Sequence, residues 1–259
     1  MTGNNHKGVV LQDRDRHLLQ ELSVMRVIDR EQAKCVAGFG STTRANSRLL
    51  TLTRAGLLRR FFQGTIGGGQ KALYALSSTG ASLAQVPYRG PRRGRNAVLV
   101  ADFFVTHQLW INRLYCTLKY QPIAVPGATF RRWVSFMQSV EPGLSLIPDG
   151  YAEIETPDKT VGVFFEIDLN NTSRSVWRAK VKKYFELGIS GNFVKNFGLP
   201  QFRVLVVTTS RRRMNSLRVA TAAITEKIFW FSTLNEAANG AFWSPVWSRP
   251  KGDQHLRLL

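Results

Sequence analysis

The sequence predicts a mixed α/β protein with two domains. In residues 1–84, three stretches with the apolar spacing of helices precede two short strands around a glycine-rich turn. In residues 98–259, helices alternate with apolar runs of strand length, which is the pattern of a mixed central sheet. Between them, residues 85–97 are rich in proline, glycine and arginine, and this composition predicts a basic linker.

The charge of the chain restricts the kinds of partner. Its 259 residues include 36 Lys and Arg against 17 Asp and Glu, a formal net charge of +19 at pH 7. Hydrophobic residues make up 44%, so the charge lies on a globular body and not on a disordered tail. Such an excess favours nucleic acid as the partner, ahead of an acidic membrane surface. No signal-peptide core and no apolar run of membrane-spanning length is present in the sequence, so we expect a cytoplasmic protein without a membrane partner.

Capping residues delimit the helices of the first domain. Asp13 is the expected cap of the first helix. Asp29 and Gln32 have the spacing of a capping box, which predicts the start of a second helix. Ser41 or Thr42 is the expected cap of a third helix.

A β-hairpin follows the third helix. Its expected strands cover residues 57–62 and 72–76, and the glycine-rich turn covers 64–69. Three helices and then a hairpin is the order of a winged helix. The phrases LTRAGLLRR at 52–60 and LYALSSTG at 73–80 resemble the ends of the wing in bacterial winged-helix regulators.

A winged helix can insert its third helix into a major groove of DNA and lay its wing on the backbone. The residues of the third helix expected at DNA are Thr43, Arg44, Asn46, Ser47, Arg48 and Arg54, and those of the wing are Arg59, Arg60 and Lys71. In the linker, Arg92, Arg93 and Arg95 can enter a minor groove, although a solvated tether fits the linker equally well. Winged helices also mediate protein contacts. The basic residues of this domain therefore favour DNA binding but do not require it.

The second domain shows a helix followed by apolar or alternating runs. The expected elements are a helix over 101–119, strand-like runs over 144–147, 151–155 and 161–167, a basic helix over 175–187, a strand over 202–208 and a helix over 211–228. Three carboxylates mark the strands: Asp149 follows Pro148, and Glu166 and Asp168 stand at the end of the run over 161–167.

This order of elements and carboxylates resembles the restriction-endonuclease-like core. The resemblance implies that Asp149 and Glu166 bind a divalent cation, Mg²⁺ or Mn²⁺, because hard carboxylate oxygens suit these ions. A bound ion of this kind polarises a phosphoryl oxygen and lowers the pKa of a water molecule. The resemblance also implies a Lys two positions after the Glu.

The chain departs from that pattern, because the Lys position holds Asp168. Asp168 is then either a third metal ligand or a sign that catalysis is lost. A Lys from the following helix can replace the missing one, and we choose Lys180, with Lys182 and Lys183 as alternatives. Tyr184 shares a helix face with Lys180 and is the candidate nucleophile for a covalent intermediate, although packing against the sheet is the favoured interpretation. The basic groove for a polyanionic substrate is expected to include Arg174, Arg178, Lys182 and Lys183.

As a set, these motifs resemble the replication-relaxation family of plasmid proteins, to which the mobilisation-C type relaxases belong. The set comprises the winged helix, Thr106-His107, PDG at 148–150, FEID at 165–168 and KxxxY at 180–184. The resemblance implies a bacterial protein that binds double-stranded plasmid DNA at an origin of transfer, nicks or relaxes it, and meets single-stranded DNA afterwards. It also implies an accessory mobilisation protein and a coupling ATPase as partners.

Two functions are compatible with the sequence. The first is a metal-dependent DNA endonuclease or relaxase. The alternative is a non-enzymatic winged-helix protein, a replication accessory factor or transcriptional regulator, on a degenerate nuclease scaffold; the missing Lys favours it. The aromatic C-terminal extension has a similar ambiguity, since its rings are expected to pack in the core but can also stack on single-stranded bases. These aromatic residues are Phe229, Trp230, Phe231, Trp243 and Trp247.

Overall fold

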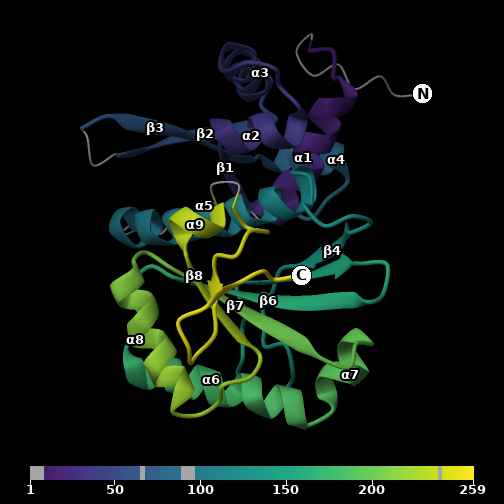
Figure 1. Ribbon diagram of the computed structural model, residues 1–259. Coiled ribbons are helices and arrows are strands. Elements are labelled where there is room, and N and C mark those ends of the chain that lie inside the picture. The colour runs from purple at the N-terminus through teal and green to yellow at the C-terminus, as the bar shows by residue number, and fades with distance from the viewer. Residues whose placement is uncertain (1–8, 65–67, 89–96, 239–240) are drawn as a thin grey trace. The chain divides into compact units, whose positions relative to one another are not determined.

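A computed structural model describes residues 9–64, 68–88, 97–238 and 241–259. The chain divides into two compact units, Met1–Cys116, called unit 1, and Thr117–Leu259, called unit 2 (Figure 1). Helices occur in both units and each has its own sheet, so the predicted mixed α/β class is confirmed. Within the described ranges, no helix has both the length and the apolar composition needed to cross a membrane.

Unit 1 contains the predicted three helices and hairpin. Its elements are α1 (Asp13–Met25), β1 (Val27–Asp29), α2 (Arg30–Ala37), α3 (Thr42–Arg54), β2 (Leu58–Gly64), β3 (Gln70–Leu76), α4 (Ser78–Ala84) and α5 (Ala97–Tyr120), whose last four residues belong to unit 2. The strands form an antiparallel sheet in the order β1-β3-β2, so the hairpin gains a third strand that the sequence did not predict. This is the element order of a winged helix.

The helices of unit 1 begin at the predicted capping residues, with one correction. Asp29 accepts from the backbone N of Gln32 at 2.8 Å, which closes the predicted capping box of α2. Ser41 caps α3 and settles the alternative with Thr42. The prediction for α1 was wrong by one residue: its N-cap is Gln12, and Asp13 is the first helical residue.

Helix α5 packs against other elements of unit 1. The Asn112 side chain is buried and donates to the carbonyl oxygens of Met25, at 3.0 Å, and Val27, at 2.6 Å. The Tyr115 hydroxyl donates to Glu21 at 2.6 Å. These buried hydrogen bonds place α5, up to residue 116, in the first compact unit.

Unit 2 is built around a seven-stranded mixed sheet. Its elements are β4 (Thr129–Val134), β5 (Gly150–Glu155), β6 (Thr160–Asp168), α6 (Arg174–Ile189), α7 (Asn192–Phe197), β7 (Phe202–Thr208), α8 (Arg211–Ala222), β8 (Phe229–Thr233), α9 (Leu234–Ala238), β9 (Trp247–Ser248) and β10 (His255–Leu256). The order is β10-β9-β8-β7-β6-β5-β4, with β6, β7 and β8 parallel to one another and the remaining pairs antiparallel. The run over 144–147, expected as a strand, lies outside these strands.

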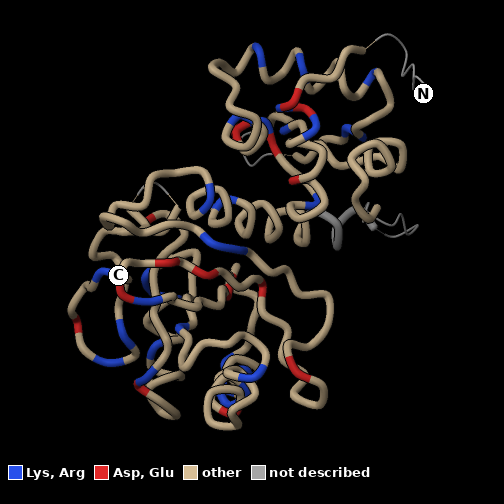
Figure 2. The backbone as a smooth tube through the Cα atoms, turned by 90° about the vertical axis from the view of Figure 1, so that its right-hand side faces the viewer, with Lys and Arg blue, Asp and Glu red and all other residues tan. Residues whose placement is uncertain are grey.

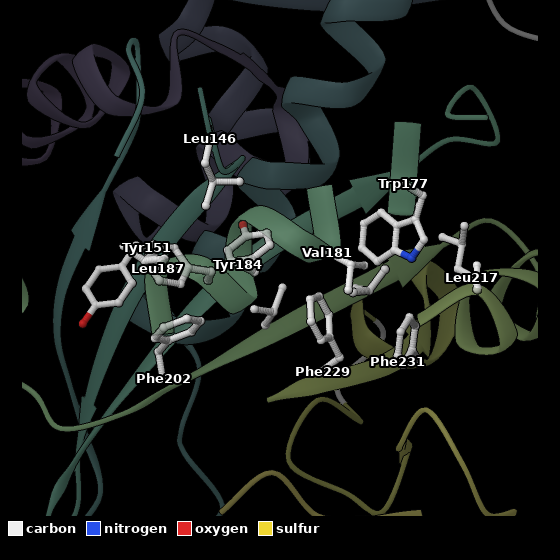
Figure 3. Packing of buried hydrophobic residues seen from close by; sticks show 14 of the residues in the cluster. Leu146, Tyr151, Trp177, Val181, Tyr184, Leu187, Phe202, Leu217, Phe229 and Phe231 are labelled. Carbon is white, nitrogen blue, oxygen red and sulfur yellow. The ribbon is translucent and has the colours of Figure 1, made fainter. Parts of the chain in front are cut away.

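The core of unit 2 lies between the sheet and helices α6 and α8 (Figure 3). Helix α6 contributes a buried face that includes Trp177, Val181, Tyr184 and Leu187. Burying each such side chain stabilises the fold by roughly 1.5–3 kcal/mol. This face holds α6 on the sheet and positions its polar residues relative to the strand ends.

The C-terminal aromatic residues are mostly buried, in line with the favoured core-packing interpretation. Phe229 and Phe231 lie in the core cluster, and Trp243 and Trp247 are also buried. Trp230 is only partly buried, so the core-packing interpretation does not extend to it.

Candidate functional site

The candidate catalytic site lies where β5 begins and β6 ends. Gly150 pairs with Phe165 in the antiparallel β5–β6 ladder, so the preceding residue, Asp149, lies beside Glu166. The backbone N of Asp149 donates to the Phe165 carbonyl at 3.1 Å, and the backbone N of Ile167 donates to Asp149 Oδ2 at 2.7 Å. The strand pairing therefore brings together two carboxylates that are 17 residues apart in the sequence.

Glu166 is buried and both its oxygens accept hydrogen bonds. The Tyr184 hydroxyl donates to Oε1 at 2.6 Å, and the Lys180 ammonium donates to Oε2. Burial raises the pKa of Glu166 to about 7, with help from the negative charge of Asp149, while Lys180 and Tyr184 oppose the shift. A proton or a cation near this group is therefore strongly stabilised.

Lys180 is the cation that the structure places there. Burial alone would lower the pKa of Lys180, but the charges of Glu166, Asp149 and Asp168 outweigh it and raise that pKa. Burial and the charge of Glu166 raise the pKa of Tyr184 well above its usual value. Tyr184 is thus held as a neutral donor in the core, which agrees with the packing interpretation and disfavours a phenolate nucleophile.

Asp168 has a different partner. Arg213 Nε donates to Oδ1 at 2.7 Å and Arg213 Nη2 donates to Oδ2 at 2.8 Å, while the backbone N of Asn170 donates to Oδ1 at 2.8 Å. Burial opposes ionisation, but these donors outweigh it and lower the pKa of Asp168. Both oxygens of Asp168 therefore already bind a neighbouring cation.

Arg213 was not predicted from the sequence. It stands in the first turn of α8, directly after β7, and β7 is the parallel neighbour of β6, with Asp168 opposite Thr208. The three consecutive arginines at 211–213 directly follow a strand. Because the carboxyl ends of parallel strands meet at one edge of a sheet, this position indicates an arginine close to the end of β6.

The three expected metal ligands are not equally suited to a metal ion. The described residues contain no group of three or more His, Cys, Asp or Glu side chains arranged to hold a metal ion. Both oxygens of Asp168 accept hydrogen bonds from Arg213. Asp149 and Glu166 lie side by side, and Mg²⁺ commonly takes one or two carboxylates and completes its shell with water and substrate phosphate; an ion bound to this pair would replace the Lys180 ammonium at Glu166.

Basic residues also lie on the exposed side of α6. Arg174, Arg178 and Lys182 are exposed and recur every four residues, so they form one ridge on the helix surface. Arg174 Nε donates to Ser216 Oγ at 3.0 Å, and Lys183 Nζ donates to the Ser145 carbonyl at 2.9 Å. Figure 2 shows Lys and Arg in blue and Asp and Glu in red along the backbone of the described residues. We call Arg174, Arg178 and Lys182 the α6 ridge.

Helix α3 of unit 1 presents the expected polar side. Its buried residues are Ala45, Leu49 and Leu52. Thr43, Arg44, Ser47 and Arg54 are exposed, and Asn46 is partly exposed. Five of the six predicted α3 residues therefore reach the surface of the unit without a strong internal partner in the described part.

Arg48 is the exception on α3. Its Nε donates to Asp15 Oδ1 at 2.9 Å, and its Nη2 donates to the Val10 carbonyl at 2.7 Å. Asp15 is fully buried, so Arg48 serves as the counter-ion of a buried carboxylate on α1. The sequence, which favours Arg48 as a DNA contact, does not indicate this internal partner.

The wing residues also have internal contacts. Lys71 pairs with Asp29, Arg60 stacks over Phe62 at 4.5 Å from the ring centroid, and Arg59 contacts Tyr88. All three remain at least partly exposed. The linker residues Arg92, Arg93 and Arg95 lie outside the described residues.

Comparisons with known proteins identify one family. The model of the replication-relaxation family matches residues 19–200, which is more than half of the chain. No curated protein matches the chain. Two solved structures of the restriction endonuclease FokI, one of them bound to DNA, share 12% identity with it and have TM-scores of 0.33 and 0.31. These alignments cover 88% and 90% of this chain but only 43% and 46% of theirs, so the chain spans less than half the length of those structures.

Proposed function

Because the chain belongs to the replication-relaxation family, we propose that it is a plasmid mobilisation relaxase. Family membership supports the coarser conclusion, a role in DNA processing. The finer proposal is that the protein binds an origin of transfer and nicks or relaxes it by metal-dependent phosphodiester cleavage. The observation that carries it is the cluster of Asp149, Glu166 and Lys180 at one strand end.

Each residue of the cluster has a proposed role. Asp149 and Glu166 would hold Mg²⁺ or Mn²⁺, which when bound polarises the phosphodiester and acidifies a water molecule. Lys180 neutralises the two carboxylates in the free protein and can stabilise negative charge that develops on the phosphate. Asp168 and Arg213 support the same edge of the sheet as an ion pair.

Hydrolysis fits this cluster better than a covalent intermediate does. Tyr184 is fully buried and donates its hydroxyl hydrogen bond to Glu166, so it positions that carboxylate. A nucleophile would have to leave this contact and reach the substrate. We therefore propose that the product is a nick without a protein–DNA bond.

DNA binding is proposed for both units. In the winged-helix domain of residues 1–84, Thr43, Arg44 and Ser47 would face the major groove, with the wing on the backbone and the linker over 85–97 beside it. In the nuclease-like domain, the α6 ridge would guide the phosphate backbone toward the carboxylates. Single-stranded DNA after nicking, an accessory mobilisation protein and a coupling ATPase belong to the proposal through the family resemblance alone.

The alternative function is a non-enzymatic DNA-binding protein on a degenerate nuclease scaffold. One observation favours it. Asp168 occupies the position where the restriction-endonuclease-like pattern has a Lys, and Asp168 accepts two hydrogen bonds from Arg213. In that case Lys180 is a permanent structural counter-ion and not part of a reaction.

A nicking assay separates the two functions. Supercoiled plasmid with its cognate origin is incubated with the wild type, Asp149→Asn and Asp158→Asn, in Mn²⁺ and in EDTA. Asp158 is exposed on the turn between β5 and β6 and serves as the matched control. We expect open circles from the wild type and Asp158→Asn with Mn²⁺ only, and none from Asp149→Asn. Equal conversion by all three proteins, or none by any of them while DNA binding persists, contradicts the enzyme.

A further inference from the structure

A second cationic site lies in unit 2, away from the carboxylates. A cavity of about 320 Å³ opens where β6, β7 and β8 begin. This volume is at the lower end of the roughly 300–1,000 Å³ of small-ligand pockets. Among the described residues that line it, none is acidic. The charged ones are Lys159, Arg203, Lys227 and Arg249, and the aromatic ones are Phe202 and Trp230.

Two guanidinium groups converge on one indole ring in this cavity. The Cζ atom of Arg203 lies 5.0 Å from the ring centroid of Trp230, and that of Arg249 lies 4.6 Å from it. Within the described part of the chain, both arginines donate to backbone carbonyls and neither pairs with a carboxylate: Arg203 donates to Leu258, and Arg249 donates to Glu226 at 2.9 Å. The cations are therefore fixed in place without being neutralised.

This arrangement is electrostatically costly in the absence of an anion. Burial lowers the pKa of Arg203, and burial together with the charge of Arg203 lowers the pKa of Arg249. Partly buried like charges are unfavourable unless a counter-ion joins them. Stacking on Trp230 offsets only a part of that cost.

The chemistry of the lining selects a phosphate group. Guanidinium groups donate pairs of hydrogen bonds to phosphate oxygens, and Lys ammonium groups add charge. The ring of Trp230 already has both arginines stacked on it, so it serves to hold them and not to stack on a base. Lys159 and Lys227 are exposed at the cavity and can complete the charge around a phosphate.

The cavity is distinct from the carboxylate cluster. Gly162 lines the cavity and Glu166 is four residues further along β6, a separation of about 13 Å at 3.3 Å per residue. Glu166 pairs with Val206, which faces the core with α6, whereas Arg203 alternates to the opposite face of β7. Arg203 and Glu166 thus lie on opposite faces and toward different ends of the same sheet.

We propose that the Arg203–Arg249 cavity is a binding site for a phosphate group, separate from the proposed cleavage site. The phosphate can belong to a DNA strand end, to the internal backbone of DNA, or to a free phosphate or nucleotide. These sources share one chemistry and are distinguished by experiment. The proposal goes beyond the relaxase function and does not depend on it.

The first test measures binding of inorganic phosphate to the full chain by titration calorimetry in EDTA. The variants are Arg249→Gln and Lys227→Gln, and the matched control is Arg212→Gln, an exposed arginine that does not line the cavity. We expect Arg249→Gln to weaken binding by about tenfold or more, because it removes hydrogen bonds to a charged acceptor. Lys227→Gln should weaken it severalfold, and Arg212→Gln should match the wild type.

Thermal unfolding of each variant keeps the test decisive. Lys227 is exposed, so Lys227→Gln should fold normally even if Arg249→Gln does not. Equal phosphate affinity in the wild type, Lys227→Gln and Arg249→Gln, or no phosphate binding by the wild type, overturns the proposal. Asp149→Asn should bind phosphate as the wild type does, so failure of the cleavage function leaves this result unaffected.

Three DNA duplexes then identify the source of the phosphate. They have the same sequence and are nicked with a 5′-phosphate, nicked with a 5′-hydroxyl, or intact. Tighter binding of the phosphorylated nick that disappears in Arg249→Gln assigns the cavity to a strand end. An equal decrease in affinity for all three duplexes assigns it to the internal backbone, and a decrease for inorganic phosphate alone assigns it to a free ligand.

Discussion

At the scale of single residues, Glu166 shows how the fold sets the chemistry of the candidate site. Its usual pKa of 4.5 rises to about 7, chiefly through burial, and Asp149 adds to the shift. Lys180 limits the rise by donating to the same carboxylate. The free protein therefore keeps a Glu166 that gains or loses a proton near neutral pH, with a cation already beside it.

The shift predicts a specific dependence of stability on pH. The pKa of Glu166 is higher in the folded chain than in the unfolded chain, so its protonated form stabilises the fold. This stabilisation is complete at pH values below the pKa of the unfolded chain and is lost as pH rises through about 7. The loss amounts to roughly 3 kcal/mol at 1.36 kcal/mol per pKa unit. In urea unfolding at pH 5 and pH 8, the wild type should lose more stability than Glu166→Gln between the two conditions. The same change in both proteins would show that Glu166 is not perturbed.

Arg44 and Arg48 are one helical turn apart on α3, yet we expect opposite effects from their substitution. Arg48→Ala leaves the buried Asp15 without its counter-ion and should lower the free energy of unfolding by roughly 3–5 kcal/mol. Arg44→Ala should leave stability within about 0.5 kcal/mol, because Arg44 is exposed, and should weaken cognate DNA binding by roughly 1–3 kcal/mol. Urea unfolding and fluorescence anisotropy measure the two effects. Matching stabilities of the two variants would contradict the role of the Arg48–Asp15 pair.

At the scale of elements, α6 links packing to the candidate site, because its buried face holds Lys180 and Tyr184 at the end of β6. Trp177 fills the core in the first turns of α6, and its Nε1 donates to Thr221 on α8 at 2.8 Å. The neighbouring residue Val176 is exposed. One helix thus offers a buried position and an exposed one side by side.

We expect Trp177→Ala to lower the free energy of unfolding by roughly 3–5 kcal/mol, because it removes packing and leaves a cavity against α8. The matched substitution Val176→Ala should change it by no more than about 0.5 kcal/mol. Denaturant unfolding measures both. If the two substitutions cost the same, α6 does not pack as described.

The elements also show what local sequence patterns can predict. The capping box at Asp29 and Gln32, the hairpin and the apolar run of β6 are local signals, and each was predicted. Strand β1 has only three residues and depends on its pairing with β3, so no local pattern indicates it. The contacts of Arg213 with Asp168 and of Arg48 with Asp15 join residues 45 and 33 positions apart. Such pairings depend on the tertiary fold, so no local sequence pattern indicates them.

At the scale of the whole molecule, the net charge of +19 distributes over two units that have different candidate tasks. Unit 1 presents α3, whose exposed side chains suit base edges. Unit 2 presents the α6 ridge, which suits a phosphate backbone and lies on the helix that also carries Lys180. Sequence preference and general affinity should therefore respond to different substitutions.

Salt dependence tests this division. Removing the interaction with one phosphate should reduce the slope of log K against log salt concentration by about 0.9 for duplex DNA. We expect Arg178→Gln on the α6 ridge to reduce the slope by about that amount, equally for cognate and unrelated duplexes, because an interaction with phosphate carries no sequence information. Arg44→Ala should instead lower the ratio of cognate to unrelated affinity.

Lys195→Gln is the matched control, since Lys195 is an exposed cation on α7 outside the ridge. Anisotropy titrations between 50 and 200 mM salt, roughly the range in which such interactions are felt, provide the slopes. A slope for Arg178→Gln equal to that of Lys195→Gln and the wild type would remove the α6 ridge from the DNA interface and leave unit 1 as the remaining candidate for binding DNA.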